Sequence, residues 1–124
     1  MEHPLYPEAS PQIARKRREL APKPLEAFRA FSAAVFADGA LPAKTKQLIA
    51  VAVAHVTQCP YCIRGHTQSA LKAGATEQEI MEAAWVAAEM RAGGAYAHSA
   101  LAIDVMLHAH ADAAAGPDPQ APAA

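Results

Sequence analysis

Apolar residues recur along this chain at the three- and four-residue spacing of α-helices, and no stretch shows the alternation typical of strands. The spacing predicts one helix from Leu25 to Ala37, ended by Asp38-Gly39, and another from about Ala43 to Gln58. The second of these is apolar almost all the way round, which predicts a central place in the domain or in a subunit interface. The pattern as a whole predicts an all-α fold.

A third helix is expected to begin at the two cysteines. Cys59 would lie near its N-cap, and Pro60 would occupy the first helical position, where proline is favoured. The sequence Lys72-Ala73-Gly74 is expected to end it.

The second half of the chain predicts two further helices. Thr76 and Glu79 have the spacing of a capping box for a helix from roughly Glu77 to Ala92. The pair Gly93-Gly94 is expected to break or kink that helix before a fifth segment, from about Tyr96 to Ala111.

These elements predict three parts: an N-terminal lead segment over residues 1–24, a helical domain over 25–113 and a disordered, linker-like tail over 114–124. The lead segment begins with an irregular stretch that contains Pro4, Pro7 and Pro11. The lead carries the basic run Arg15-Lys16-Arg17-Arg18. In a chain with a net charge of −1, such a run is better interpreted as a solvated helix face than as a nucleic-acid contact.

Composition limits the class of protein further. The 124 residues suffice for one domain, and the net charge gives no electrostatic case for binding nucleic acid or an anionic membrane. Hydrophobic residues make up 52% of the chain, much of it alanine, which favours helices but buries little area per residue. We therefore expect a homo-oligomer.

The cysteine count and the N-terminus indicate a compartment. Two cysteines are too few for a secreted disulfide scaffold, and the first residues do not resemble a signal peptide. The longest nearly apolar stretch, 48–56, is interrupted by His55 and is too short to cross a bilayer. We expect a soluble cytoplasmic protein, in which a cysteine pair favours redox catalysis or metal binding.

The candidate chemistry lies at Cys59 and Cys62, with His66 one helical turn later and His55 one turn earlier. A helix N-terminus stabilises a thiolate, the reactive form of cysteine. His66 can accept or return a proton near neutral pH, and His55 would approach the same sulfurs if the helical spacing continued.

Two other interpretations remain open. Two cysteines and two histidines are also the inventory of a structural zinc site, although zinc-finger ligand pairs are normally well separated. Two inert buried cysteines are the structural alternative. A thioredoxin-like site is disfavoured, because that motif follows a strand.

The chain resembles the alkylhydroperoxidase D-like core of the carboxymuconolactone decarboxylase superfamily. The likeness covers about Leu41 to His98, and three stretches carry it: Leu48-Ile49-Ala50-Val51-Ala52-Val53-Ala54, Cys59-Pro60-Tyr61-Cys62-Ile63-Arg64-Gly65-His66 and Ala73-Gly74-Ala75-Thr76-Glu77-Gln78-Glu79-Ile80. It implies an all-helical domain that assembles as a trimer or a hexamer. We expect no cofactor and no bound metal. The resemblance also implies thiol-dependent reduction of hydroperoxides, with the disulfide re-reduced by a partner protein or a small dithiol.

Carried over residue by residue, the resemblance makes Cys62 the peroxidatic cysteine, Cys59 its resolving partner and His66 part of the proton relay. Two positions depart from the family pattern. Gln47 stands twelve residues before Cys59, where a glutamate is familiar, and Tyr61 stands where a histidine is familiar. An amide cannot relay a proton as a carboxylate does.

His55 is the expected replacement for the missing base. Glu89 and His98 are further candidates, but a solvated carboxylate and a structural histidine are the favoured interpretations. The leading hypothesis is a thiol peroxidase that cycles a dithiol and a disulfide. The alternatives are a non-enzymatic redox-sensing or zinc-binding module and a decarboxylase-type member, whose chemistry does not call for a cysteine pair.

Overall fold

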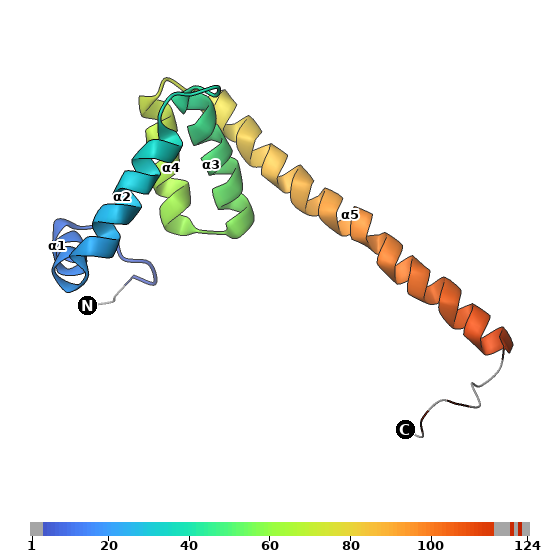
Figure 1. The fold of residues 1–124 in the computed structure, drawn as a ribbon. Helices are drawn as coiled ribbons and strands as arrows, with labels where there is room; N and C mark the ends of the chain where they lie inside the picture. Colours follow the sequence, from blue (N-terminus) through green and yellow to red (C-terminus); the bar gives the residue numbers. More distant parts are fainter. Residues whose placement is uncertain (1–3, 116–119, 121, 123–124) are drawn as a thin grey trace. The chain divides into compact units, whose positions relative to one another are not determined.

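The computed structural model describes residues 4–115, 120 and 122, with side chains described only as far as Ala109 within the last helix. Its helices are α1 (Pro11–Leu20), α2 (Pro22–Phe36), α3 (Ala43–Thr57), α4 (Pro60–Lys72) and α5 (Glu77–Ala115) (Figure 1). The described residues include no strand, and the predicted all-α fold is confirmed. None of the described helices has the length and apolarity needed to cross a membrane.

The chain divides into two units, Met1–Ala87 and Ala88–Ala124. The first unit contains α1 to α4 and the first turns of α5, and the second contains the remainder of α5. The cysteine motif belongs to the first unit.

Helices α3 and α4 lie side by side and antiparallel in the first unit (Figure 1). Gln58 ends α3 in the left-handed conformation, with φ of 57° and ψ of 44°, and its N–H donates to the carbonyl of Ala54. The chain reverses there within two residues, and α4 begins at Pro60, as predicted. At the other end of α4, Gly74 adopts a φ of 95°, which fits the predicted glycine stop.

The core of the first unit is small. Val51, Ala70 and Ala75 are buried, and the partly buried side chains of Leu48, Ile80 and Ala83 pack against them. Val51 is the largest fully buried side chain among the described residues. The alanines let the helices approach closely but bury little area, so large apolar side chains elsewhere remain exposed.

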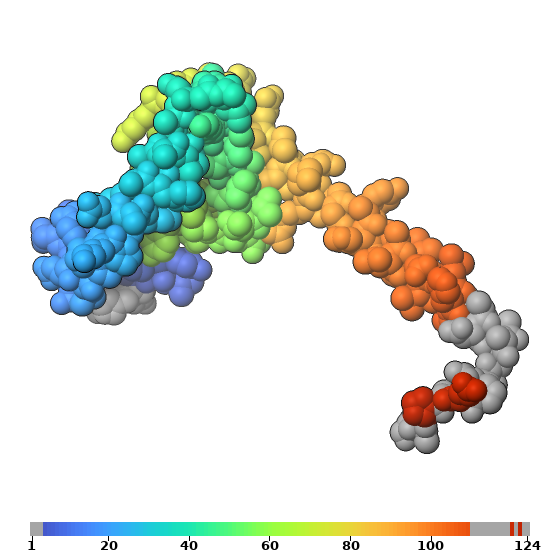
Figure 2. All heavy atoms as spheres, viewed as in Figure 1, coloured from blue at the N-terminus to red at the C-terminus, as the bar shows by residue number. Residues whose placement is uncertain are grey.

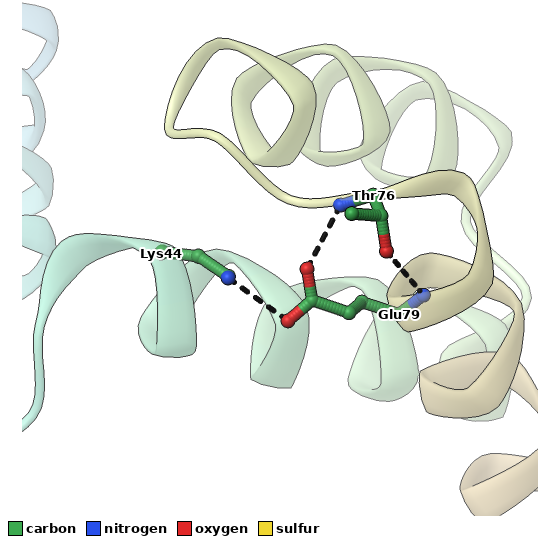
Figure 3. A network of polar contacts seen from close by, with 3 residues as sticks. All are labelled: Lys44, Thr76 and Glu79. Carbon is green, nitrogen blue, oxygen red and sulfur yellow. Dashed lines mark hydrogen bonds and ion pairs between the residues drawn. The ribbon is translucent and has the colours of Figure 1, made fainter.

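The predicted capping box at the start of α5 is confirmed (Figure 3). The Glu79 N–H donates to Thr76 Oγ1 at 3.1 Å, and the Thr76 N–H donates to Glu79 Oε1 at 2.9 Å. The other oxygen of Glu79, Oε2, lies 2.9 Å from Lys44 Nζ on α3. The Lys44 hydrogen bond is the main cause that lowers the pKa of Glu79, so the Glu79 carboxyl group is ionised at neutral pH.

The predicted break at Gly93-Gly94 is wrong, because α5 continues through both glycines to Ala115. A glycine costs about 1 kcal/mol relative to alanine inside a helix. That cost ends a helix only where the neighbouring residues also disfavour it. Here the neighbours are largely alanine, and residues 77–116 contain no proline. The two predicted helices, 77–92 and 96–111, are therefore one.

Helix α1, Pro11–Leu20, lies within the predicted lead segment and carries the basic run. Ser10 caps this helix by accepting a hydrogen bond from the Ile13 N–H at 3.2 Å, and Pro11 takes the first position. The basic run is exposed along α1, as expected for a solvated helix face.

Helix α5 includes residues 114 and 115, the first two of the predicted tail. The rest of the predicted disordered tail, at 116–119, 121 and 123–124, lies outside the described residues. The domain limits at 25 and 113 stay predictions.

Candidate functional site

The two cysteines lie at the first turn of α4. Cys59 is the N-cap, with extended backbone angles, and its Sγ accepts a hydrogen bond from the Cys62 N–H at 3.3 Å. Its carbonyl accepts from the Ile63 N–H at 2.9 Å, which starts the helical pattern. Both residues are free thiols and partly exposed. Cys59 thus stands where an N-cap side chain receives a backbone donor and the positive end of the helix dipole.

The two thiols differ in acidity. Hydrogen bonds from the Cys62 thiol, and then from its backbone N–H, lower the pKa of Cys59. Donation of that same thiol hydrogen bond raises the pKa of Cys62, and burial and the nearby charge on Cys59 raise it further. The pair therefore ionises first at Cys59 and keeps its shared proton on Cys62.

Gln47 lies directly against His66. The distance from Gln47 Oε1, on α3, to His66 Nδ1, on α4, is 2.8 Å. A carbonyl oxygen only accepts hydrogen bonds, so Nδ1 carries the proton and Nε2 holds the lone pair. The ring of Phe36, at the end of α2, stacks on the imidazole with centroids 5.1 Å apart and an angle of 29°. The amide and the phenyl ring together fix both the tautomer and the plane of His66.

Cys62 and His66 line one cavity of about 430 Å³ between α2, α3 and α4. Its walls are mostly aliphatic and aromatic carbon. The lining residues are Val35, Phe36, Lys46, Ile49, Ala50, Val53, Ala54, Thr57, Cys62 and His66. Cys59 is not among them, so the less acidic thiol faces the cavity.

The sequence pattern of the carboxymuconolactone decarboxylase family matches residues 22–105, which include the helices that build the cavity. The chain belongs to this family. The expected resemblance is therefore confirmed at the level of the family.

Relatives agree with this membership. A Paracoccus denitrificans protein known as uncharacterized protein 4 in cox locus is 67% identical over 81 residues, which cover 65% of this chain and 73% of that protein. A carboxymuconolactone decarboxylase family protein from Legionella pneumophila, solved in its apo form, is 42% identical with a TM-score of 0.60, covering 64% of this chain and 70% of its own. A protein structure from Methanobacterium thermoautotrophicum is 41% identical with a TM-score of 0.64, covering 68% and 98%.

His55, the expected replacement base, makes a hydrogen bond within its own helix. Its Nδ1–H donates to the Val51 carbonyl at 2.7 Å, on its own helix, and it does not line the cavity. The expected stripe of four residues assumed helical spacing from His55 to Cys59, but the left-handed Gln58 ends the helix between them. In the described part of the chain, no hydrogen bond connects His55 with either thiol.

Among the described residues, no hydrogen bond connects either thiol with the side chain of Glu89, His98 or Tyr61. Glu89 and His98 belong to the second unit and are exposed, and Tyr61 makes an edge-to-face contact with Tyr6 at a centroid distance of 6.1 Å. Over the described residues, no three side chains of histidine, cysteine, aspartate or glutamate gather as a metal site would require. The zinc interpretation therefore gains no support from the geometry.

Two residues that line the cavity escaped the sequence analysis. Phe36 had a weak signal, since it ends the apolar pattern of the helix before Asp38-Gly39. Lys46 had none, because its place in the cavity depends on how α3 packs against α2.

Proposed function

We propose that this protein is a thiol peroxidase that reduces organic hydroperoxides through a cycle of Cys59 and Cys62 between dithiol and disulfide. The observation that carries the proposal is the placement of Cys62 and His66 on the wall of one apolar cavity, with Cys59 hydrogen-bonded to Cys62 behind it. A reactive thiol, a base with a free lone pair and a second thiol are the groups that such a cycle requires.

In the first step, the Cys62 thiol gives its proton to His66 Nε2. The resulting thiolate attacks the terminal oxygen of the hydroperoxide, so that a sulfur–oxygen bond forms while the oxygen–oxygen bond breaks. The departing alkoxide takes the proton back from the imidazolium and leaves as an alcohol. Cys62 is then a sulfenic acid, and the hydroperoxide has been reduced by two electrons.

In the second step, Cys59 attacks the Cys62 sulfur and forms the disulfide. The hydroxide expelled from Cys62 takes a proton from solvent and leaves as water. The lowered pKa of Cys59 serves this step, because it increases the fraction of the attacking sulfur that is thiolate at a given pH. An external dithiol then restores both thiols by exchange and is itself oxidised, with Cys59, the more acidic thiol, as the better leaving group.

The test is consumption of an organic hydroperoxide by the purified protein with and without an added dithiol. Turnover should need the dithiol, because each catalytic cycle ends at the disulfide. Protein that consumes no hydroperoxide under either condition would rule the proposal out.

Gln47 limits the rate in this scheme. Its amide orients His66 but cannot stabilise the imidazolium that forms in the first step, whereas a carboxylate in the same place would. We expect Gln47→Glu to raise kcat by about tenfold near neutral pH and to raise the pKa of His66. Steady-state kinetics and an NMR titration of the imidazole measure both effects, and Gln47→Met is the variant that removes the oriented acceptor. Unchanged turnover in both variants would mean that the relay runs through other groups.

We further propose that the working protein is an oligomer. Every described side chain from Ala95 to Ala109 on α5 is exposed, although many are apolar (Figure 2). Tyr96, Leu101 and Val105 are 82%, 66% and 67% exposed. Trp85 and Phe28 in the first unit are 69% and 65% exposed. A monomer rarely leaves so much apolar surface in water, and a second copy of the chain would cover it.

Light scattering coupled to size exclusion tests the assembly. The unaltered chain should elute as a trimer or a hexamer, and Leu101→Glu should shift it towards smaller species, because a carboxylate at an apolar interface loses its hydration. Leu101→Met keeps the apolar character and should keep the assembly. A monomeric mass for the unaltered chain would contradict the proposal.

A further inference from the structure

Lys46 brings a positive charge to the wall of the cavity that holds Cys62 and His66. It is the one residue of permanent charge among the cavity-lining residues, and it is partly buried. The other walls are largely aliphatic, and a charge in apolar surroundings is costly unless it is paired.

The Lys46 ammonium is held firmly in place. Its Nζ donates to the carbonyls of Val35 at 2.8 Å and Ala37 at 2.6 Å, at the C-terminal end of α2. Carbonyls at a helix C-terminus lack intrahelical partners and attract cations. These two bonds leave the third N–H of the ammonium without a protein acceptor among the described residues.

No carboxylate neutralises this charge in the described part of the chain. The contrast with Lys44, two residues earlier on α3, is direct: Lys44 Nζ is 2.9 Å from Glu79 Oε2. Asp38 lies in the loop after α2, but its Oδ1 accepts the Ala43 N–H at 2.7 Å, and it forms no ion pair with Lys46. Lys46 therefore keeps one free donor and its whole charge, beside an apolar cavity.

From this we infer that the cavity binds organic hydroperoxides that carry a carboxylate, with the anionic end at Lys46, the apolar body against Ile49 and Val53, and the peroxide group at Cys62 and His66. The inference rests on the proposed peroxidase function for its reaction, but the carboxylate site itself can be tested without turnover. A carboxylate would take the free N–H of Lys46 in a charge-assisted hydrogen bond.

Octanoate and its neutral methyl ester are matched probes of this site. In a Cys59→Ser background, Cys62 is the sole thiol, and its rate of alkylation by iodoacetamide reports occupancy of the cavity. Octanoate should protect Cys62 at a concentration about tenfold lower than the ester does, since one charge-assisted hydrogen bond at a partly exposed site has about that effect. Added salt should weaken protection by octanoate and leave protection by the ester unchanged.

Lys46→Met should remove the difference between the two probes, and Lys46→Arg should retain it. Lys44→Met removes a lysine on the same helix but outside the cavity. It should not change the difference in protection between octanoate and the ester, relative to the Cys59→Ser protein that keeps both lysines. Two results would overturn the inference. One is equal protection by octanoate and the ester in the protein that keeps Lys46, and the other is a folded Lys46→Met protein in which octanoate still protects at a lower concentration than the ester. Circular dichroism establishes folding, and the salt dependence decides the matter if Lys46→Met does not fold.

The kinetic counterpart uses a fatty-acid hydroperoxide and its methyl ester as substrates. The acid should have the larger kcat/KM by about tenfold, and this preference should disappear in Lys46→Met. If both substrates are consumed equally, the carboxylate site fails and the peroxidase function stands. If neither is consumed while octanoate still protects Cys62 selectively, the peroxidase function fails and the anion site stands.

Discussion

Cys62→Ser is expected to abolish dithiol-dependent turnover of organic hydroperoxides, with a loss of about three orders of magnitude or more. A serine hydroxyl keeps the size and the hydrogen-bonding capacity of the thiol but is a far weaker nucleophile towards peroxide oxygen, and the loss of a nucleophile commonly has an effect of this size. Initial rates with saturating dithiol measure it.

Cys59→Ser is the matched comparison. It should still reduce one equivalent of hydroperoxide, because Cys62 and His66 remain in the cavity, and then stop at the sulfenic acid for want of a resolving thiol. The difference in acidity makes the reverse assignment the serious alternative, since Cys59 is the thiol that ionises first. A single turnover retained in Cys62→Ser and lost in Cys59→Ser would exchange the two roles.

His66→Asn is expected to lower kcat/KM by about a hundredfold near neutral pH, within the usual range for loss of a general base. An asparagine amide can still donate to Gln47 Oε1, but it cannot accept the proton of Cys62. The loss should shrink as pH rises. The pKa of Cys62 is raised, so without a base its thiolate forms only in alkaline solution.

The pH–rate profile therefore separates the two roles open to His66. With His66 as the base, the profile of the variant moves to higher pH relative to the unaltered protein. A uniform loss at every pH would instead mean that His66 only supports the structure of the site. Phe36→Leu, which removes the stacked ring and keeps the imidazole, should leave the position of the profile unchanged while reducing its height.

Local signals in the sequence account for much of the fold. Proline after Cys59, the Thr76–Glu79 box and the glycine at 74 each act within a few residues, and the structure has each where it was predicted. The N-terminal helix was within reach of the same argument, because Ser10 and Pro11 are a cap and a first-position proline. The predicted helix break at Gly93-Gly94 was wrong, because the effect of glycine on a helix depends on the neighbouring residues.

The arrangement of the site was only partly accessible from sequence. Gln47 was identified from its spacing, but its contact with His66 depends on the packing of α3 against α4. The contribution of α2, with Phe36 stacked on the imidazole and two carbonyls holding Lys46, is tertiary, and only Phe36 left a weak signal in the sequence. The left-handed Gln58 ends α3 between His55 and Cys59, so the helical spacing that was assumed from one to the other does not hold.

The central claim is that hydroperoxide oxidises this cysteine pair. The most direct test treats the protein with one equivalent of an organic hydroperoxide, without reductant, and analyses the intact protein and its peptides by mass spectrometry. The predicted result is stoichiometric loss of two hydrogen atoms, with the product peptide joined by a disulfide between Cys59 and Cys62, and trapping by dimedone at Cys62 in the Cys59→Ser protein. Two thiols that remain free beside unconsumed hydroperoxide would contradict it.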